Sequence, residues 1–515
     1  MKKGLLIILL ITLLLSGSGC KKKNVDPIDD NYRVFYEIFT GSFSDSNNDG
    51  IGDLKGIIKR LDYLNDGDID SGKSLGIQGI WLTPIFKSPS YHKYDVIDYY
   101  EIDPSFGTQE DLDKLIQEAH KRNVKIILDM VINHTSDRNE WFKEFVKAHQ
   151  NKDINNQYYD YYVYADNDKI PANRRFKQIS GTNQSYECNF SDDMPELNFE
   201  NEKVREEVLN IAKFYLDKSI DGFRFDAAKY VYMNDNKTSV DFWNWYCDEL
   251  RKIKDDVYLV GEVWSSEGEI SEYIKAMNCF NFSIAQAEGL IAQTAKGNNI
   301  NTFTNYIEKY QEAIQKQNRH AIAIPFISNH DMDRCAGYLN VSNGLAYMGA
   351  NLYILSPGSP FIYYGEEIGM KGTRGGTNTD ANRRLAMLWG DDDTIQDPEG
   401  SSYAKNKQVN GTVKEQLADE NSLLNYYGKL IAFRNRYPQI ARGVYKRYNL
   451  NQKNLGGFAI TYKGETTYLI HNNSTEEISI EAKMFNVLID YIGLNDAELK
   501  DGRLRVGPYT SVLLK

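Results

Sequence analysis

Three short apolar stretches of this chain each lead into an acidic side chain. The stretches are Gly222–Phe225, Val257–Gly261 and Ala321–Ser328, and the acids that follow them are Asp226, Glu262 and Asp331. Each stretch has the length and apolar content of a buried strand. If the strands are parallel and close into a barrel, their carboxyl ends meet at one mouth, where catalytic residues sit. Two carboxyl groups at such a mouth are the equipment for cleaving a glycosidic bond, one as proton donor and one as nucleophile.

A basic side chain accompanies the first of these acids. Arg224 lies two residues before Asp226, so on a strand both side chains point to the same face. A fixed cation there would keep Asp226 ionised. A reaction that retains the anomeric configuration needs two carboxyl groups about 5–5.5 Å apart in opposite protonation states. The sequence therefore favours Asp226 as the ionised partner.

A second group of oxygen-bearing side chains lies between Asp45 and Asp53. The side chains are those of Asp45, Asn47, Asp49 and Asp53, with Gly50 permitting a sharp turn and Ile51 offering a carbonyl oxygen. This spacing suits a hard cation with six or more oxygen ligands, and we expect Ca²⁺. Gly56 stands where a helix–loop–helix calcium hand would place Glu, so the full hand is absent. The alternative is a turn of Asx and Gly residues without metal.

Short apolar stretches alternate with amphipathic ones over most of the chain, which predicts β/α units around a parallel sheet. The expected strands are 32–39, 77–82, 124–129, 222–225, 257–261, 279–282, 321–328 and 360–363. The expected helices include 54–64, 112–121, 204–218 and 422–436. The fold class is thus α/β, a (β/α)₈ TIM barrel.

The alternation is interrupted after His134. Residues 135–204 are rich in Asn, Asp and Tyr and lack a clear period, and a structureless loop of that length is implausible in a compact domain. We expect an inserted domain there, after the third strand, with the barrel formed by 32–134 and 205–437. Beyond the barrel, apolar and polar residues alternate with a period of two, which predicts a C-terminal β-sandwich over 438–515.

The N-terminus has the form of an export signal. Lys2 and Lys3 precede an apolar run, 4–15, that is too short for a stable membrane anchor. Small residues then lead to Cys20, which resembles a bacterial lipoprotein signal (1–20) followed by a polar tether (21–31). We expect an extracytoplasmic protein, either a cell-surface lipoprotein anchored through a lipid on Cys20 or, with ordinary cleavage, a secreted one.

Composition limits the partners. The chain has 60 basic and 72 acidic residues among 515, a net charge of -12, which argues against nucleic acid and fits a neutral substrate. Cys188, Cys247, Cys279 and Cys335 show neither CxxC pairing nor a disulfide framework, so we interpret them as free packing residues. We expect a monomer.

Several motifs together resemble glycoside hydrolase family 13, the α-amylase family, from about Tyr32 to the C-terminus. The main motifs are Asp129–His134, Gly222–Lys229, Gly261–Trp264 and Phe326–Asp331, and the supporting ones are Gly79–Pro84, Met194–Asn198 and Gly365–Gly369. Their order along the chain is that of the family. The resemblance implies a TIM barrel that acts on α-glucans such as starch and maltodextrins.

The resemblance also implies roles for the three acids. Asp226 is expected to be the nucleophile that attacks the anomeric carbon. Glu262 is expected to protonate the leaving oxygen and then to activate water. Asp331 is expected to bind sugar hydroxyls and to help distort the ring.

Further residues match the family's substrate-binding positions. His134 and His330 are expected to bind hydroxyls of the sugar being cleaved, Tyr94 to stack on it, and Lys229 to contact the leaving-group side. Arg224 completes the expected substrate site. Tyr230 stands where the family's amylases commonly have His, which argues against their shared calcium site near Asn133. Related oligosaccharide hydrolases carry a calcium loop similar to 45–53.

We expect retaining endo-hydrolysis of α-1,4 bonds, because Ala227–Lys229 after the nucleophile is typical of the family's amylases. A maltodextrin glucosidase or a neopullulanase-like hydrolase is the alternative, favoured by His92–Asp95 and Met194–Asn198. The alternative from another class is a catalytically inactive glycan-binding surface protein. The presence of all three acids argues against it.

Overall fold

The computed structural model describes residues 28–68, 71–375, 379–404, 406 and 410–515. The predicted signal and Cys20 lie outside these residues, so the lipid anchor stays a prediction. The end of the predicted tether packs on the folded domain, with Ile28 buried and Asp30 in an ion pair of 2.6 Å with Arg442. Within the described ranges, no helix has the length and apolar character needed to cross a membrane.

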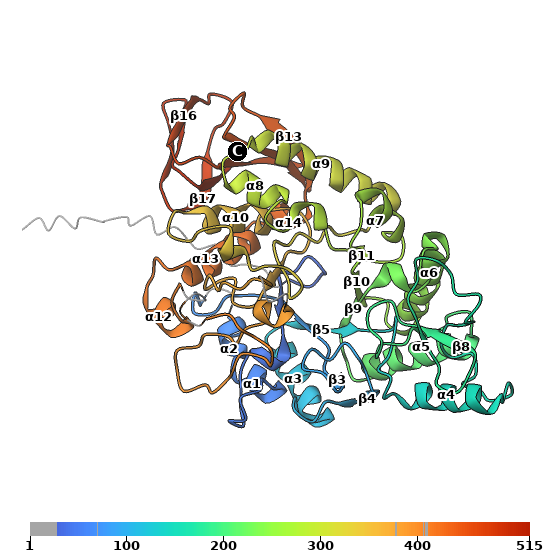
Figure 1. Ribbon diagram of the computed structural model, residues 1–515. Coiled ribbons are helices and arrows are strands. Elements are labelled where there is room, and N and C mark those ends of the chain that lie inside the picture. The colour runs from blue at the N-terminus through green and yellow to red at the C-terminus, as the bar shows by residue number, and fades with distance from the viewer. Residues whose placement is uncertain (1–27, 69–70, 376–378, 405, 407–409) are drawn as a thin grey trace, which may run out of the picture.

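A parallel sheet of seven strands forms the centre of the molecule (Figure 1), in the order β11-β10-β9-β5-β2-β1-β12. Its strands are β1 (Phe35–Ile38), β2 (Gly79–Leu82), β5 (Lys125–Met130), β9 (Gly222–Phe225), β10 (Tyr258–Gly261), β11 (Asn278–Cys279) and β12 (Phe361–Tyr363). Nearly every residue in them is buried, as expected for a sheet covered on both faces. Side chains such as Phe35, Trp81 and Phe280 fill the interior of the barrel.

The predicted strand 321–328 lies in its place between β11 and β12, but it does not form a regular strand. Asn281 donates its N–H to the carbonyl of Ile324 (3.1 Å), and Phe361 donates to that of Pro325 (3.0 Å). One isolated bridge, at Ile324, is the only ladder contact assigned to this segment. Pro325 has no N–H and cannot donate a hydrogen bond to a ladder. The expectation of eight regular strands was therefore wrong at this position, although the segment closes the barrel.

Helices cover the outside of the sheet. They are α1 (Leu54–Lys59), α2 (Leu61–Leu64), α3 (Gln109–Lys121), α5 (Glu202–Asp217), α6 (Asn236–Ile253), α7 (Glu267–Tyr273), α8 (Leu290–Ala295), α9 (Ile300–Gln317), α10 (Leu345–Ile354), α12 (Val413–Ala418) and α13 (Leu423–Arg436). In α3, a capping box between Thr108 and Asp111 begins the helix, and its buried residues recur at helical spacing. The ends of the helices predicted from sequence periodicity agree with those of the observed helices to within a few residues.

Two segments leave the barrel on the side of the strands' carboxyl ends. The loop after β2 carries a short hairpin, β3 (Phe86–Lys87) and β4 (Asp98–Ile102). The segment 135–204 carries α4 (Glu140–Asn151) and a three-stranded antiparallel sheet of β6 (Tyr164–Asp166), β7 (Phe176–Gln178) and β8 (Gln184–Glu187). A bridge between His134 and Glu196 joins the two ends of this segment next to β5.

The C-terminal part follows α14 (Pro438–Arg442) and consists of two antiparallel sheets, seen in orange and red in Figure 1. One has the order β13-β14-β15-β20-β17 and the other β16-β19-β18. The strands are β13 (Val444–Asn449), β14 (Leu455–Tyr462), β15 (Glu465–Asn472), β16 (Ile478–Glu481), β17 (Leu488–Gly493), β18 (Ala497–Lys500), β19 (Arg503–Val506) and β20 (Thr510–Leu514). Ile470, Leu504 and Val512 belong to the core that the two sheets share. The predicted all-β module is present.

Candidate active site

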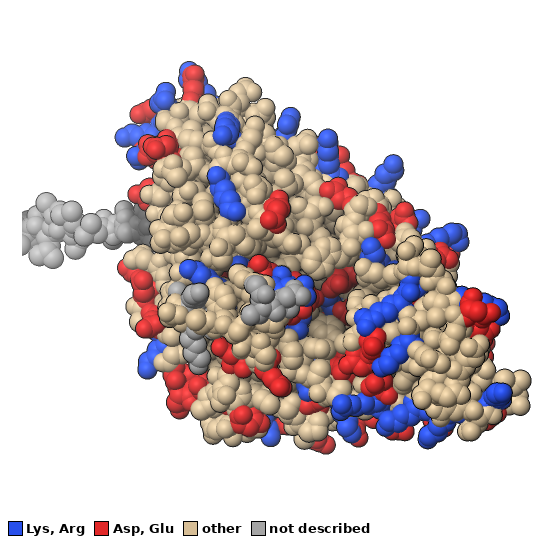
Figure 2. Space-filling view, in the orientation of Figure 1, with Lys and Arg blue, Asp and Glu red and all other residues tan. Residues whose placement is uncertain are grey.

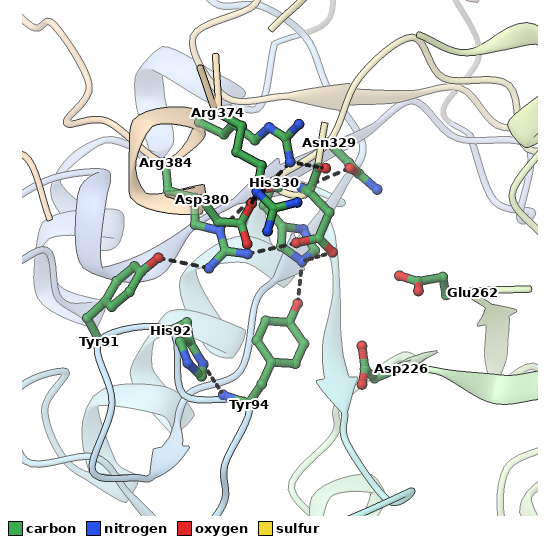
Figure 3. Close-up of polar contacts among 12 residues, drawn as sticks. Tyr91, His92, Tyr94, Asp226, Glu262, Asn329, His330, Arg374, Asp380 and Arg384 are labelled. Atoms are coloured by element: carbon green, nitrogen blue, oxygen red, sulfur yellow. Dashed lines mark hydrogen bonds and ion pairs between the residues drawn. The ribbon is translucent and has the colours of Figure 1, made fainter. Parts of the chain in front are cut away.

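The three predicted acids lie together at the carboxyl ends of the barrel strands. Asp226 directly follows β9, Glu262 directly follows β10, and Asp331 follows the segment 321–328. Their side chains are 12%, 14% and 32% exposed, so each is largely desolvated and still open to a solute. Figure 2 shows a recess near the centre of this face of the molecule, with acidic and basic side chains around it. In Figure 3, the carboxyl groups of Asp226 and Glu262 approach the same space.

Arg224 connects the two carboxyl groups. Its Nη1 donates to Asp226 Oδ1 at 2.8 Å, and its Nη2 donates to Glu262 Oε2. Nη1 also donates to Asp129 Oδ1 at 2.8 Å. The side chain is fully buried, which by itself would lower the pKa of Arg224, but the surrounding carboxylates raise that pKa well above its usual range. The prediction that Arg224 faces Asp226 is confirmed by this geometry, and the same guanidinium also holds Glu262.

The surroundings of Glu262 favour its protonated form. Burial, together with the charge of Asp226, raises the pKa of Glu262 to about 8 against the opposing effect of Arg224. Glu262 therefore keeps its proton at neutral pH. The cation of Arg224, 2.8 Å from Asp226, stabilises the carboxylate of Asp226. A protonated carboxyl group beside a second carboxyl group at a shared mouth is the arrangement from which a retaining glycosidase works.

A network of charged groups fixes Asp331. Arg384 Nη2 donates to Asp331 Oδ1 at 2.7 Å, and His330 Nε2 lies 3.1 Å from Oδ2. Burial would raise the pKa of Asp331, but His330 and Arg384 outweigh it and hold that pKa below its usual range. His330 Nδ1 lies 2.6 Å from Glu37 Oε1. Burial would lower the pKa of His330, yet Asp331 and Glu37 raise it to about 10, so the imidazolium form persists at neutral pH.

Tyr94 and His134 lie around the same space. The hydroxyl of Tyr94 lies 2.7 Å from His330 Nε2 (Figure 3). It also donates to Asp129 Oδ2 at 3.0 Å. His134 is buried, its Nε2 has no hydrogen-bond partner, and burial lowers its pKa. An unpaired buried ring nitrogen is costly unless a ligand satisfies it. His134 thus offers a hydrogen bond to a bound molecule.

Lys229 lies farther from the three acids. Its Nζ is 3.4 Å from Ser265 Oγ and 3.8 Å from Glu269 Oε1. Ser265 belongs to the loop after β10 that also carries Glu262. Lys229 therefore contacts the loop that carries Glu262.

Several residues of the site were not predicted from the sequence to have a role. Asp129 is the next-to-last residue of β5, at the same end of the sheet as Asp226, so the rule that identified the other acids would also have identified it. Glu37 lies on β1. Arg384 and Tyr91 come from loops, and they bind each other through Nη1 and the Tyr hydroxyl at 3.0 Å (Figure 3). His92, in the same loop, accepts the N–H of Tyr94 at 3.1 Å. No periodicity marks loop residues of this kind.

The predicted metal loop is held by its own backbone. Asp45 is 3% exposed, and its carboxylate accepts N–H groups from Asn47, Asn48 and Gly50 at 2.8–2.9 Å. The two oxygens of Asp53 accept from the backbone of Gly56 and Ser46 at 2.7 and 3.0 Å. Both oxygens of Asp45 and Oδ2 of Asp53 each accept two donors, so binding of Ca²⁺ by these oxygens would replace some of these hydrogen bonds.

The acidic side chains of the loop 45–53 do not form a preformed metal site. Within the described ranges, no group of three or more acidic, His or Cys side chains has the geometry to hold a metal ion. Asp49 is exposed at the loop tip, where its Oδ1 accepts the N–H of Ile51 at 2.8 Å. The amide and carbonyl oxygens of Asn47 and Ile51 would have to complete the ligand set.

Comparison with known proteins gives a consistent result. Residues 37–443 match the family model of the α-amylase catalytic domain. The chain is 36% identical over 491 residues to Alpha-amylase 3 of Dictyoglomus thermophilum, covering 94% of this chain and 93% of that protein. It is 30% identical to an oligo-1,6-glucosidase of Bacillus cereus, covering 87% and 91%.

Solved structures agree with the sequence relatives. Eubacterium rectale Amy13B superposes with a TM-score of 0.88 at 36% identity, covering 96% of this chain and 97% of that one. The α-amylase from H. orenii gives a TM-score of 0.82 at 34% identity, covering 94% and 99%. With its acids at the mouth of a barrel that these proteins share, the chain belongs to the α-amylase family, glycoside hydrolase family 13.

Proposed function

We propose that this glycosidase hydrolyses internal α-1,4 bonds of starch and related α-glucans with retention of configuration. The observation that carries the proposal is the fork of Arg224, which holds Asp226 and Glu262 at one mouth while burial keeps the proton on Glu262. The reaction divides into two displacements.

In the first displacement, Asp226 attacks the anomeric carbon and the glycosidic bond breaks. Glu262 gives its proton to the leaving oxygen, so a neutral sugar departs and a glycosyl ester remains on Asp226. In the second, the Glu262 carboxylate takes a proton from water, whose oxygen attacks the same carbon and releases Asp226. The second inversion restores the original configuration.

The remaining polar groups bind the sugar whose bond is cleaved. Asp331, fixed between Arg384 and His330, presents a carboxylate to its hydroxyls. His134 offers its unpaired Nε2. The ring of Tyr94 lies parallel to that of His330, at 5.4 Å and 12°, which presents a flat face for the sugar. These groups favour a sugar ring distorted toward the oxocarbenium shape.

Cleavage at internal bonds of the glucan distinguishes an amylase from the glucosidase alternative. The relative named α-amylase supports the first, and the relative named oligo-1,6-glucosidase supports the second. A maltoheptaoside with a capped non-reducing end tests the difference. We expect its cleavage at a rate within about tenfold of the uncapped sugar, a barrier difference of roughly 1.4 kcal/mol. An intact capped substrate, with glucose as the first product of the uncapped one, would establish the glucosidase activity instead.

Activity should fall at alkaline pH. Glu262 is competent as an acid only while protonated, so kcat/KM for a glucan should decrease above pH 8 by about tenfold for each further pH unit. Glycosyl fluorides need no protonation of the leaving group and should show no such decrease. The pH profile of kcat/KM measured on both substrates checks this, and an identical alkaline decrease on both would remove the assignment to Glu262.

We also propose that the loop 45–53 holds Ca²⁺ through Asp45, Asn47, Asp49, Ile51 and Asp53. A metal bound only by the folded state stabilises by mass action. Chelator should lower the melting temperature of the native protein, and Asp49→Ala should abolish this sensitivity. Asp49 is the informative position because it is exposed, whereas Asp45 and Asp53 also hold the backbone. Asp392→Ala, at an exposed acid near the loop, is the control. A melting temperature unchanged by chelator would speak against the ion.

A further inference from the structure

Two acids that take no part in the proposed reaction are buried in the segment inserted after β5. Glu187 is the last residue of β8 and is fully buried, and Glu196, in the motif Met194–Asn198, is nearly so. A buried carboxyl group is costly unless hydrogen-bond donors or a cation surround it. The partners of these two acids therefore carry information about what holds the inserted segment in place.

Arg174 supplies a cation to the first of the acids. It lies in the turn between β6 and β7, and its partly exposed side chain reaches inward to Glu187. Nε donates to Glu187 Oε1 at 2.5 Å, and Nη2 donates to Oε2. One guanidinium thus holds both oxygens of one carboxylate, a geometry that fixes the orientation of the pair as well as its separation.

Asn189 joins the two acids to each other. Its Nδ2 donates to Glu187 Oε1 at 2.7 Å and to Glu196 Oε1 at 2.8 Å, and its backbone N–H donates to Glu196 Oε1 at 3.0 Å. Burial, together with the charge of Glu187, raises the pKa of Glu196 to about 8 against the opposing hydrogen bonds from Asn189. Glu196 therefore keeps its proton at neutral pH, and the cation of Arg174 is left to pair with Glu187.

The backbone of Glu196 connects this network to the active site. Glu196 forms an antiparallel bridge with His134, whose Nε2 is one of the groups offered to the sugar. Beside the bridge, Leu197 donates its N–H to the carbonyl of Asn133 at 3.0 Å. On the other side, the N–H of Glu196 is bonded to the carbonyl of Glu187 at 3.0 Å. The acid that Arg174 holds is thus one backbone hydrogen bond away from the chain that pairs with His134.

A side-chain contact makes a second connection. Phe190 directly follows Asn189, and its ring lies 5.3 Å from that of His134. A displacement of Glu187 would therefore disturb both the backbone bridge and the ring contact of His134. Because a hydrogen bond weakens steeply with distance and angle, a small movement of His134 would reduce what its Nε2 contributes to sugar binding.

We propose that Arg174 is a positioning residue, whose fork on Glu187 fixes the inserted segment so that His134 presents Nε2 to the sugar being cleaved. The inference rests on the proposed role of His134 in binding that sugar. Arg174 acts on the reaction from the surface side of the inserted segment, through Glu187, Asn189 and the backbone of Glu196.

The test is a double-mutant cycle with maltosyl fluoride, a substrate that endo- and exo-acting retaining enzymes both cleave. Arg174→Met should lower kcat/KM, normalised to folded enzyme, by about tenfold, equivalent to roughly 1.4 kcal/mol, because the fork is lost. In a His134→Ala background the same change should alter kcat/KM by less than about twofold, because the group through which Arg174 acts is gone. Arg174→Lys keeps the charge without the fork and should recover part of the loss.

The next residue provides the matched control. Arg175 pairs with Asp192 at 2.5 Å on the surface, so Arg175→Met should leave kcat/KM unchanged. If Arg174→Met lowers the melting temperature but keeps the native kcat/KM, its role is structural only and the inference is overturned. An effect of equal size that persists in the His134→Ala background would also overturn it, since Arg174 would then act through another group. A native kcat/KM in His134→Ala alone would contradict the proposed sugar contact of His134, and the inference with it.

Discussion

Asp226→Asn should lower kcat on α-glucans by about 10³-fold or more, equivalent to roughly 4 kcal/mol in the barrier, because the amide cannot form the glycosyl ester. The variant should still fold. Asn can keep the hydrogen bond from Arg224 Nη1, which at present joins Asp226 Oδ1 at 2.8 Å. Steady-state rates on soluble starch, with melting curves of both proteins, check the expectation.

A matched control lies at the opposite end of the same strand. Asp221 directly precedes β9, at the end opposite to Asp226, where it accepts the N–H of Ile126 at 2.8 Å and pairs with His120. Asp221→Asn makes the same chemical change in a buried acid and should retain the native kcat. Near-native activity in the Asp226 variant would refute its assignment as nucleophile.

Arg224→Met should produce the second large effect, on both stability and activity. Three carboxyl groups, on Asp129, Asp226 and Glu262, lose their shared cation in a fully buried position. Leaving buried charge without its partner costs about 3–5 kcal/mol of unfolding free energy. Loss of a preorganised electrostatic group should lower kcat of the folded fraction by about 10²- to 10³-fold. Denaturant unfolding and active-site-normalised rates measure the two effects.

Arg434 provides the comparison for this experiment. It is 1% exposed, and its guanidinium donates to the carbonyl oxygens of Ile354 and Ser356 at 2.6 and 2.7 Å, far from the acids in the fold. Arg434→Met should also lose stability, but the kcat of its folded fraction should equal that of the native enzyme. If Arg224→Met kept kcat within tenfold of native, the Arg224 fork would not be central to catalysis.

The sequence allowed the barrel and its acids to be predicted because both depend on short-range patterns. Strand and helix periods define the β/α units, and parallel strands in a barrel must end at one mouth, so Asp226, Glu262 and Asp331 were expected to meet. The same argument applied to Asp129 would have identified it. The irregularity of 321–328 was also marked in the sequence, since Pro325 interrupts the donors of a ladder.

Other contacts depend on loop conformation and could not be obtained in this way. Arg384 reaches Asp331 from 53 residues away, and Glu37 reaches His330 across 293 residues. Neither pairing follows from local spacing in the sequence. The conformation of the loop after β12 sets the first pairing, and the closure of the barrel sets the second.

The most direct test of the retaining mechanism is to trap its intermediate. A fluorinated glycosyl fluoride, whose electronegative substituent slows the second displacement, should accumulate as an ester on the native enzyme. Intact-mass analysis should then show one added glycosyl unit, and peptide mapping should place it on the peptide that contains Asp226. The Asp226→Asn variant should remain unlabelled. A label on another carboxyl group, or a native enzyme that turns over without any label and releases the inverted anomer first, would contradict the account.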